Sequence, residues 1–173
     1  MRFSFARLTE ADLPRLHGWL QQPHVREFYD DGLRSVEAVA AYYADVLSRA
    51  EPTHAFIGAC DGTPIAFLQT YRIADHPAYA AAVQVGATDA GIDMLIGEPA
   101  SAHRGLGAPL LRAFVDDVVW DVTGARTCWI GPSPRNPRAR RAYEKAGFAY
   151  VKTVDVPGHE PEVFLRLDRS ESA

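Results

Sequence analysis

Hydrophobic residues recur every three or four positions in two stretches of the N-terminal part of the chain, the spacing of helices that bury one face. The first stretch follows Thr9, a residue type that caps helices, and should end near Pro23. The second begins after Ser35, another capping residue, and should run to about Arg49. We therefore predict two helices, separated by an irregular loop over residues 24–34.

Alternating or continuous apolar runs predict the strands of the N-terminal half. The expected strands cover residues 2–8, 53–60, 65–73 and 92–97. Two of them flank the turn Asp61-Gly62-Thr63-Pro64 and should pair as a hairpin. Residues 74–90 are rich in alanine and other small residues, and we interpret them as a long linker. Linkers of this length in compact domains are usually functional or mobile, so this one should border the functional site.

The C-terminal half alternates strands with two helices. Every fourth residue from Leu106 to Val118 is apolar, which indicates an amphipathic helix. A further helix should start at Asn136, a good N-cap, and stop at Gly147. Strands are expected at residues 126–130, 149–154 and 162–167. The resulting order, β-α-α-β-β-β-α-β-α-β-β, predicts an α/β fold in which helices pack on a central sheet.

Length and composition narrow the class of protein. The chain has 173 residues, 47% of them hydrophobic, so we predict a single domain over residues 1–173. No apolar run approaches the about 20 residues that cross a bilayer, and the first residues lack a secretory signal, which favours a cytoplasmic protein with no membrane partner. The net charge of −4 argues against a nucleic-acid partner and favours a cationic substrate. An exposed strand edge would allow a homodimer.

Cysteine and histidine positions suggest no metal chemistry. Cys60 and Cys128 lie in apolar runs, where a buried free thiol is the usual outcome. The six histidines show no metal-binding spacing, so we predict that the protein uses no metal.

Residues 102–108 (AHRGLGA), here called the glycine turn, connect the strand at 92–97 with the next helix. A strand, such a turn and a helix in succession make an anion site, because free backbone N–H groups and the helix dipole both favour negative charge. The spacing does not fit a P-loop, and a dinucleotide fingerprint would need a small residue where Leu110 stands. Coenzyme A is therefore the preferred ligand, and a plain loop at a helix start is the alternative.

Residues 131–148 (GPSPRNPRARRAYEKAGF), together with HRGLGA at 103–108, resemble the GNAT superfamily of N-acetyltransferases. A more specific resemblance is to the aminoglycoside 6'-N-acetyltransferases, and it spans about Thr9 to Leu167. The further segments that carry it are TEADLPRLHGWL at 9–20, FLQTY at 67–71 and GIDMLIG at 91–97. The resemblance implies a GNAT-like, mixed and mostly antiparallel central sheet flanked by about four helices. It also implies acetyl-CoA as co-substrate and an aminoglycoside as the cationic amine.

The same resemblance implies roles for individual residues toward the cofactor. The backbone that pairs with the pantetheine arm would be that of Met94, Leu95 and Ile96. The residues that meet the pyrophosphate would be Arg104, Gly105, Leu106, Gly107 and Ala108. Asn136 would also contact the cofactor, and Tyr143 would face its sulfur. One departure from the family pattern is Ala102, which stands where the turn usually begins with Gln or Arg.

Asn136 and Tyr143 are seven residues apart, two helical turns, so both side chains can lie on one face of their helix. A thiolate leaving group has an ordinary pKa of about 8.5 and a phenol one of about 10, so Tyr143 can donate a proton while being neutral at pH 7. The alternatives are that Asn136 is only a helix cap and that Tyr143 is only a packed aromatic residue.

Asp93 is the candidate general base. A substrate amine with a pKa of about 10 arrives protonated and must lose a proton before its nitrogen attacks the thioester. Asp93 lies in the otherwise apolar strand IDMLIG, where a carboxylate could hold the ammonium and accept its proton directly or through water. A backbone N–H near Leu95 would hold the developing oxyanion, so no covalent acyl-enzyme is needed. The alternative for Asp93 is a hydrogen-bonded strand acid without a catalytic role.

Acids and aromatic residues gather in the two irregular stretches and could bind a polycation together with Asp93. These candidates are Phe28, Tyr29, Asp30 and Asp31 in the first stretch and Asp75, Tyr79 and Asp89 in the second. The alternative is that these are solvated loop charges. Compared with the resistance enzymes, this chain has Gly131 instead of an Asp before Pro-Ser-Pro, and the linker lacks their pair of Trp residues. We therefore expect aminoglycosides to bind more weakly, or their binding energy to be distributed differently among the residues of the site.

Three functions follow, in order of preference. The first is transfer of an acetyl group to an aminoglycoside 6'-amine, of the antibiotic-resistance type. The second is acyl transfer to a siderophore precursor or another small amine, although siderophore enzymes commonly have His where Asp93 stands. The third is a noncatalytic acyl-CoA-binding module, which the presence of both Asp93 and Tyr143 disfavours.

Overall fold

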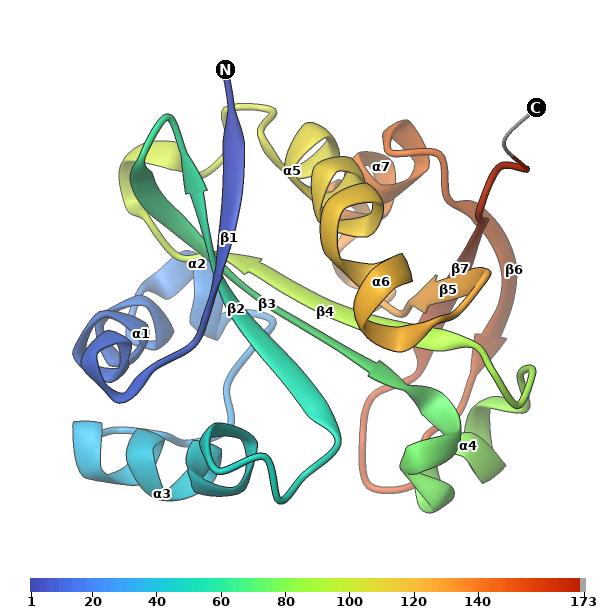
Figure 1. Ribbon diagram of the computed structural model, residues 1–173, viewed down its shortest axis with the longest axis horizontal. Coiled ribbons are helices and arrows are strands. Elements are labelled where there is room, and N and C mark those ends of the chain that lie inside the picture. The colour runs from blue at the N-terminus through green and yellow to red at the C-terminus, as the bar shows by residue number, and fades with distance from the viewer. Residues whose placement is uncertain (172–173) are drawn as a thin grey trace. The chain divides into compact units, whose positions relative to one another are not determined.

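Seven strands form a mixed sheet in the computed structural model, which describes residues 1–171 (Figure 1). Their order in the sheet is β1-β2-β3-β4-β5-β7-β6. The strands are β1 (Phe3–Arg7), β2 (Thr53–Cys60), β3 (Thr63–Arg72), β4 (Ala90–Ile96), β5 (Thr127–Ile130), β6 (Ala149–Val154) and β7 (Glu162–Asp168). β4 pairs with β5 in parallel, whereas the β1–β2, β5–β7 and β6–β7 pairs are antiparallel. The predicted mixed, mostly antiparallel sheet is confirmed.

Helices of eight or more residues match the four that the sequence predicts. In the described part of the chain they are α1 (Leu13–Leu20), α3 (Val36–Leu47), α5 (Gly107–Phe114) and α7 (Pro137–Lys145). A π turn (Val115–Val119) extends α5 into the short α6 (Trp120–Thr123). None of the described helices is both long and apolar enough to cross a membrane.

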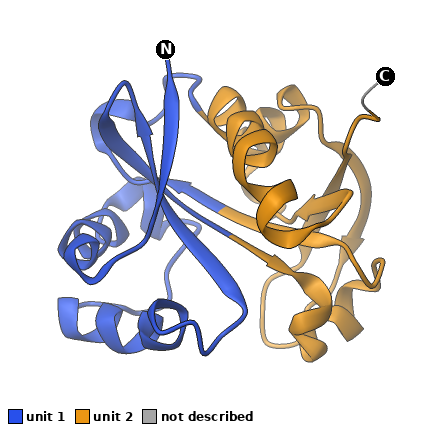
Figure 2. Cartoon of the chain, in the orientation of Figure 1, with its two compact units in different colours: residues 1–69, 94–106 blue, residues 70–93, 107–173 orange. Residues whose placement is uncertain are grey.

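The chain divides into two compact units, coloured separately in Figure 2. Unit 1 consists of Met1–Gln69 and Met94–Leu106, and unit 2 consists of Thr70–Asp93 and the chain from Gly107 onward. The boundaries fall within β3, within β4 and within the glycine turn. A single domain over residues 1–173 stays a prediction.

The core of unit 1 forms where α1 and α3 pack their apolar faces. Leu16, Val39 and Phe67 are buried there, together with the ring of Tyr43. The predicted cap at Ser35 is present, since its hydroxyl accepts a hydrogen bond from the backbone N–H of Ala38 at 3.1 Å. Thr9 precedes a 3-10 turn (Glu10–Asp12) that leads directly into α1. Local sequence therefore predicts both helix starts correctly.

The predicted loop over residues 24–34 is wrong at its beginning, because α2 (Pro23–Arg26) occupies it. Pro23 is well placed at the first helical position, and Val25 is buried in the core of unit 1. A single turn is too short to show a hydrophobic period, so only packing against the core identifies it.

The predicted linker over residues 74–90 is also wrong, because it contains a short 3-10 turn (Ile73–Asp75) and α4 (Pro77–Val83). Alanine is the strongest helix former, and Pro77 begins the helix at a position that tolerates proline. The fully buried Val83 joins the core of unit 2 with Ile73, Trp129 and Phe164. The small residues thus form a helix that carries Tyr79.

Both cysteines carry free thiols, and only one is fully buried. Cys128 lies in the sheet core at 0% exposure, whereas Cys60 is half-buried at the end of β2. The expectation of a buried thiol is therefore correct for Cys128 and wrong for Cys60, because the end of a strand is less covered than its middle.

Candidate active site

The glycine turn contains two residues with positive φ angles. His103 and Gly105 adopt left-handed φ angles of +61° and +77°. A Cβ on Gly105 would meet nothing within 4 Å, so glycine is favoured there by its φ angle and not by lack of space. The turn leads directly into α5, whose first backbone N–H groups have no partner within the helix. Binding of a pyrophosphate group by this turn stays a prediction.

β4 continues well beyond its pairing with β5. The parallel register comprises Ala90 with Cys128 and Gly91 with Trp129, whereas β4 itself runs on to Ile96. Most of the strand therefore lies beyond the residues that pair with β5. Backbone beyond that point is suited to pair with an extended ligand such as a pantetheine arm.

Side chains of α1 and α2 support the end of β4 within unit 1. The ring of His24 donates a hydrogen bond from Nε2 to the carbonyl oxygen of Ile96 at 2.9 Å. The same ring meets His103 of the glycine turn edge to face, with ring centroids 6.1 Å apart. A Cβ on Gly97 would overlap the Trp19 ring, so only glycine allows this close approach. Sequence reasoning missed His24, because a lone histidine in one helical turn carries no recognisable pattern.

Asp93 and Tyr143 lie close enough within unit 2 to interact electrostatically. Tyr143 projects from α7 and is only 7% exposed, and Asp93 is half-buried in β4. Burial raises the pKa of the Tyr143 phenol, and the charge of Asp93 raises it further. The phenol is therefore neutral across the physiological range and is able to donate a proton.

Tyr79 also interacts electrostatically with Asp93, and it is hydrogen-bonded to Glu162. The Tyr79 hydroxyl donates a hydrogen bond to Glu162 Oε2 at 2.7 Å. Burial raises the pKa of Tyr79, and the charges of Glu162 and then Asp93 add to the effect. We call Asp93, Tyr79, Tyr143 and Glu162 the phenol–carboxylate cluster. Sequence reasoning missed Glu162, although the absence of an acid at Gly131 was a signal to look for one elsewhere.

The comparisons with known proteins agree with this geometry. A family model described as an acetyltransferase (GNAT) domain matches residues 9–156. The chain belongs to the GNAT acetyltransferases. The family that the sequence predicts is thereby confirmed, and the protein is an acetyltransferase.

Two related proteins and one solved structure are similar to this chain over most of its length. The aminoglycoside N(6')-acetyltransferases type 1 of Klebsiella pneumoniae and Serratia marcescens are each 32% identical over 173 residues, covering 91% of this chain and 79% of theirs. A crystal structure of aminoglycoside acetyltransferase AAC(6')-Ib with coenzyme A and kanamycin has a TM-score of 0.85 and 29% identity. That match covers 97% of this chain and 95% of the other.

Asn136 of this GNAT acetyltransferase is a helix cap, as the alternative interpretation holds. Its side-chain oxygen accepts a hydrogen bond from the backbone N–H of Ala139 at 3.1 Å, at the start of α7. The cap uses the carbonyl oxygen, and an asparagine side chain has a separate amide donor group. Contact between Asn136 and the cofactor stays a prediction.

Asp89 has a structural role in unit 2. Its Oδ2 accepts hydrogen bonds from the Trp129 indole at 2.8 Å and from the backbone N–H of Gly86 at 3.0 Å. Asp75, by contrast, is exposed in its 3-10 turn. Of the candidates from the second irregular stretch, only Tyr79 belongs to the phenol–carboxylate cluster.

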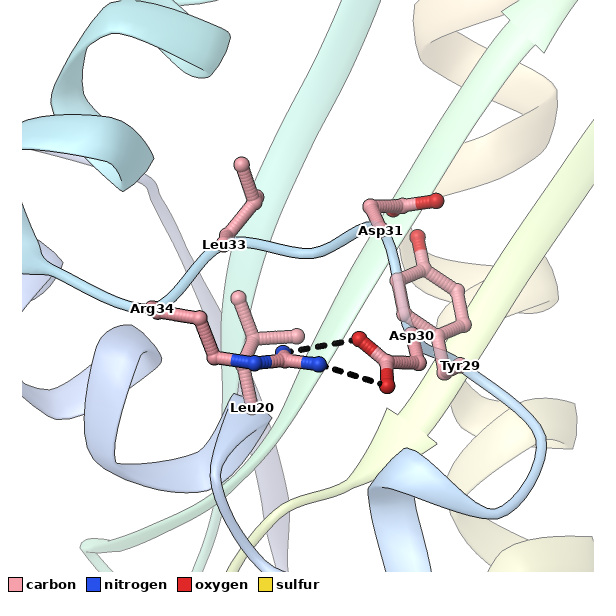
Figure 3. Close-up of a pocket in the computed structure, with 6 residues that line it drawn as sticks. All are labelled: Leu20, Tyr29, Asp30, Asp31, Leu33 and Arg34. Carbon is pink, nitrogen blue, oxygen red and sulfur yellow. Dashed lines mark hydrogen bonds and ion pairs between the residues drawn. The ribbon is translucent and has the colours of Figure 1, made fainter.

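The candidates of the first irregular stretch lie in unit 1, and three of them, Tyr29, Asp30 and Asp31, line a small hollow shown in Figure 3. Arg34 forms two hydrogen bonds of 2.8 Å to the Asp30 carboxylate, and Arg26 lies 3.7 Å from it. The hydrogen bonds from Arg34 and from the Gly32 backbone lower the pKa of Asp30. Phe28 and Tyr29 are half-buried beside it. Because guanidinium groups already neutralise Asp30, its carboxylate is poorly suited to attract a cationic substrate.

Among residues 1–171, no group of three His, Cys, Asp or Glu side chains could hold a metal ion.

Proposed function

We propose that this GNAT acetyltransferase transfers the acetyl group of acetyl-CoA to a primary amine of a cationic small molecule, with an aminoglycoside 6'-amine as the preferred acceptor. The observation that carries the chemistry is the electrostatic coupling of Asp93 with the buried Tyr143. The acceptor is suggested by relatives named for the N(6') position and by a similar structure that contains kanamycin.

Coenzyme A fits the residues that the sequence assigns to it. The glycine turn, from Arg104 to Ala108, would hold the pyrophosphate, and the backbone from Met94 to Ile96 would pair with the pantetheine arm. When bound, acetyl-CoA supplies an activated thioester, so the protein needs no nucleophile of its own. His24 contributes by holding the Ile96 carbonyl, which fixes the strand end to which the arm would bind.

Asp93 would attract the protonated amine and take its proton. A half-buried carboxylate attracts a cation more strongly than an exposed one, because less water screens it. Removing the proton gives the nitrogen its lone pair for direct attack within a ternary complex. The backbone N–H of Leu95 would hold the negative charge that develops during attack.

Tyr143 would donate its proton, or a hydrogen bond, to the departing sulfur. The raised pKa of the phenol keeps this donor protonated at every pH where the amine reacts. The same change weakens the phenol as an acid. Burial raises the pKa of the phenol, and it also makes an unprotonated thiolate nearby less stable. A proton or hydrogen bond from Tyr143 would therefore stabilise the leaving group where the thiolate is least stable.

Measuring thiol release from acetyl-CoA tests this function against the alternatives. The amine panel should contain aminoglycosides with and without a 6'-amine, hydroxylated diamines, polyamines and peptides. We expect turnover that is lost when the 6'-amine is absent. Preferred turnover of a hydroxylated diamine would favour a siderophore-type enzyme, and tight acetyl-CoA binding without any turnover would favour a noncatalytic module. A cytoplasmic location, a homodimer and the absence of nucleic-acid and membrane partners stay predictions.

A further inference from the structure

Gly131 leaves room that the side chain of Glu162 fills. A Cβ built on Gly131 would overlap Glu162 Oε2 and would lie 3.0 Å from both Glu162 Cδ and Phe164 Cδ2. The two segments are held together at this point, because the backbone N–H of Val163 donates to the Pro132 carbonyl at 2.9 Å. A side chain at position 131 and the present conformation of Glu162 therefore exclude each other. The carboxylate of Glu162, from β7, thus lies in the space that a side chain at position 131 would enter.

Tyr79 holds the Glu162 carboxylate without neutralising it. The 2.7 Å hydrogen bond comes from a neutral phenol and occupies one acceptor position on Oε2. A carboxylate has about four acceptor positions on its two oxygens, so a cationic donor can bind as well. The Tyr79 ring is itself held edge to face by Phe164, with ring centroids 6.5 Å apart. Glu162 is thus placed by α4 through a hydrogen-bond donor that carries no charge.

Glu162 and Asp93 both lie near the Tyr79 phenol. Both of their charges contribute to raising the pKa of Tyr79, so two carboxylates lie near one half-buried side chain. Burial also raises the pKa of Glu162 itself, with the Tyr79 hydrogen bond and His159 acting in the opposite direction. A bound cation favours the ionised form of a half-buried carboxylate, because an opposite charge nearby offsets the cost of burial.

We propose that Glu162 is a specificity-determining residue that binds a second ammonium group of the substrate while Asp93 binds the one that is acetylated. This inference rests on the proposed function and narrows it to acceptors with at least two amines. A second charge held away from the reacting nitrogen would fix the orientation of the substrate. A monoamine would lack that contact and bind more weakly.

Steady-state kinetics of E162Q tests the proposal with two sugars, one with amines at carbons 2 and 6 and one with the amine at carbon 6 alone. Removing one partner of a partly desolvated ion pair should raise KM for the diamine at least about tenfold, with kcat changed by less than about twofold. KM for the monoamine should not change. An equal rise for both sugars, or no rise for either, would overturn the proposal.

E160Q is the matched control, because Glu160 is an exposed glutamate two positions away that pairs with Arg135. It should leave both KM values unchanged. E162D keeps the charge but shortens the side chain by one methylene group, so its diamine KM should lie between those of the wild type and E162Q. A greater loss in E162D than in E162Q would contradict a role for the charge.

Calorimetric titration of the diamine, with coenzyme A present, separates this proposal from the proposed function. If the wild type acetylates neither sugar, the proposed function fails, and the titration still tests Glu162. We expect E162Q to bind the diamine at least about tenfold more weakly than the wild type and E160Q do. Equal dissociation constants in folded wild type and E162Q would overturn the proposal.

Discussion

Asp30 of unit 1 and Glu162 of unit 2 are both carboxylates next to tyrosine side chains, and their electrostatic surroundings are opposite. Guanidinium hydrogen bonds lower the pKa of Asp30, whereas burial raises the pKa of Glu162. Arg34 donates two hydrogen bonds to Asp30, and Tyr79 donates one to Glu162. The first carboxylate is paired with a cation already, and the second is held by a neutral group.

The difference shows why counting acids in loops does not locate a cation site. An acid beside arginines contributes little to ligand binding, because its charge is neutralised and screened by water. A half-buried acid held by a phenol is less screened by water, so a ligand cation gains more from its ionised form. By this criterion the phenol–carboxylate cluster is the better candidate for the amine site, whereas Asp30 pairs with Arg34 within unit 1.

The largest expected effect comes from Asp93→Asn. Loss of the proposed base should lower kcat by about 10²- to 10⁴-fold, the range typical of acid–base groups. Binding of acetyl-CoA should not change, since the variant keeps the shape of the side chain. Steady-state thiol release at saturating amine measures the effect, with Asp121→Asn on α6 as an exposed control. Unchanged turnover would remove Asp93 from the mechanism.

Tyr143→Phe should have the next largest effect. Without its hydroxyl the buried ring cannot donate to the departing sulfur, and kcat should fall about 10- to 100-fold, near the lower end of acid–base effects. Tyr42→Phe is the control, because Tyr42 is 54% exposed on α3. Rates measured from pH 6 to pH 9 should show no loss from phenol ionisation in the wild type, since the pKa of Tyr143 is raised. A Tyr143→Phe enzyme with wild-type kcat would leave only a packing role.

His24→Ala tests whether unit 1 serves the cofactor while the cluster serves the amine. Loss of the hydrogen bond to the Ile96 carbonyl should raise KM for acetyl-CoA about two- to tenfold, the value of one hydrogen bond. KM for the amine should stay within about twofold. The control is His17→Ala, which removes a comparable ring contact to the Arg34 carbonyl at 3.1 Å. A rise in the amine KM alone would contradict this division.

Glu162→Gln should also change how stability depends on pH. Because the folded-state pKa of Glu162 is raised above 4.5, its favourable contribution is complete below that value and is lost as pH rises through the folded pKa. E162Q cannot titrate, so its stability relative to the wild type should be higher at pH 7 than at pH 4. Thermal unfolding at both pH values measures this. E160Q should behave in the opposite way, because hydrogen bonds from Arg135 and Ser133 lower the pKa of Glu160.

Asp30→Asn should have the smallest effect on activity. Since the Asp30 carboxylate is already paired, KM for the amine should change by less than about twofold. The lowered pKa of Asp30 means that its contribution to stability is present above pH 3.8 and is lost as pH falls through the folded pKa. The variant should therefore differ from the wild type in thermal unfolding at pH 7 and approach it in strong acid. A large rise in amine KM would place Asp30 in the site after all.

The elements that the sequence predicts correctly are those with local causes. The cap at Ser35 joins groups three residues apart, and so does the cap at Asn136. The positive φ of Gly105 belongs to a single residue, and the alternation of strands follows from which face each residue covers. The family resemblance added Tyr143, and the need for a base in an otherwise apolar strand added Asp93. The structure places the two within electrostatic reach of each other.

The sequence by itself therefore determined the order of the main elements, the glycine turn before α5 and the two residues proposed for the chemistry. Tertiary structure alone decided which acids pair with arginines and which lie beside tyrosines. The Tyr79–Glu162 bond joins residues 83 positions apart, and the His24–Ile96 bond joins residues 72 positions apart. No local pattern encodes such pairs, because they depend on which strands and helices meet in the folded chain. The space beside Gly131 also depends on tertiary structure, because the side chain that fills it belongs to Glu162, which is distant in the sequence.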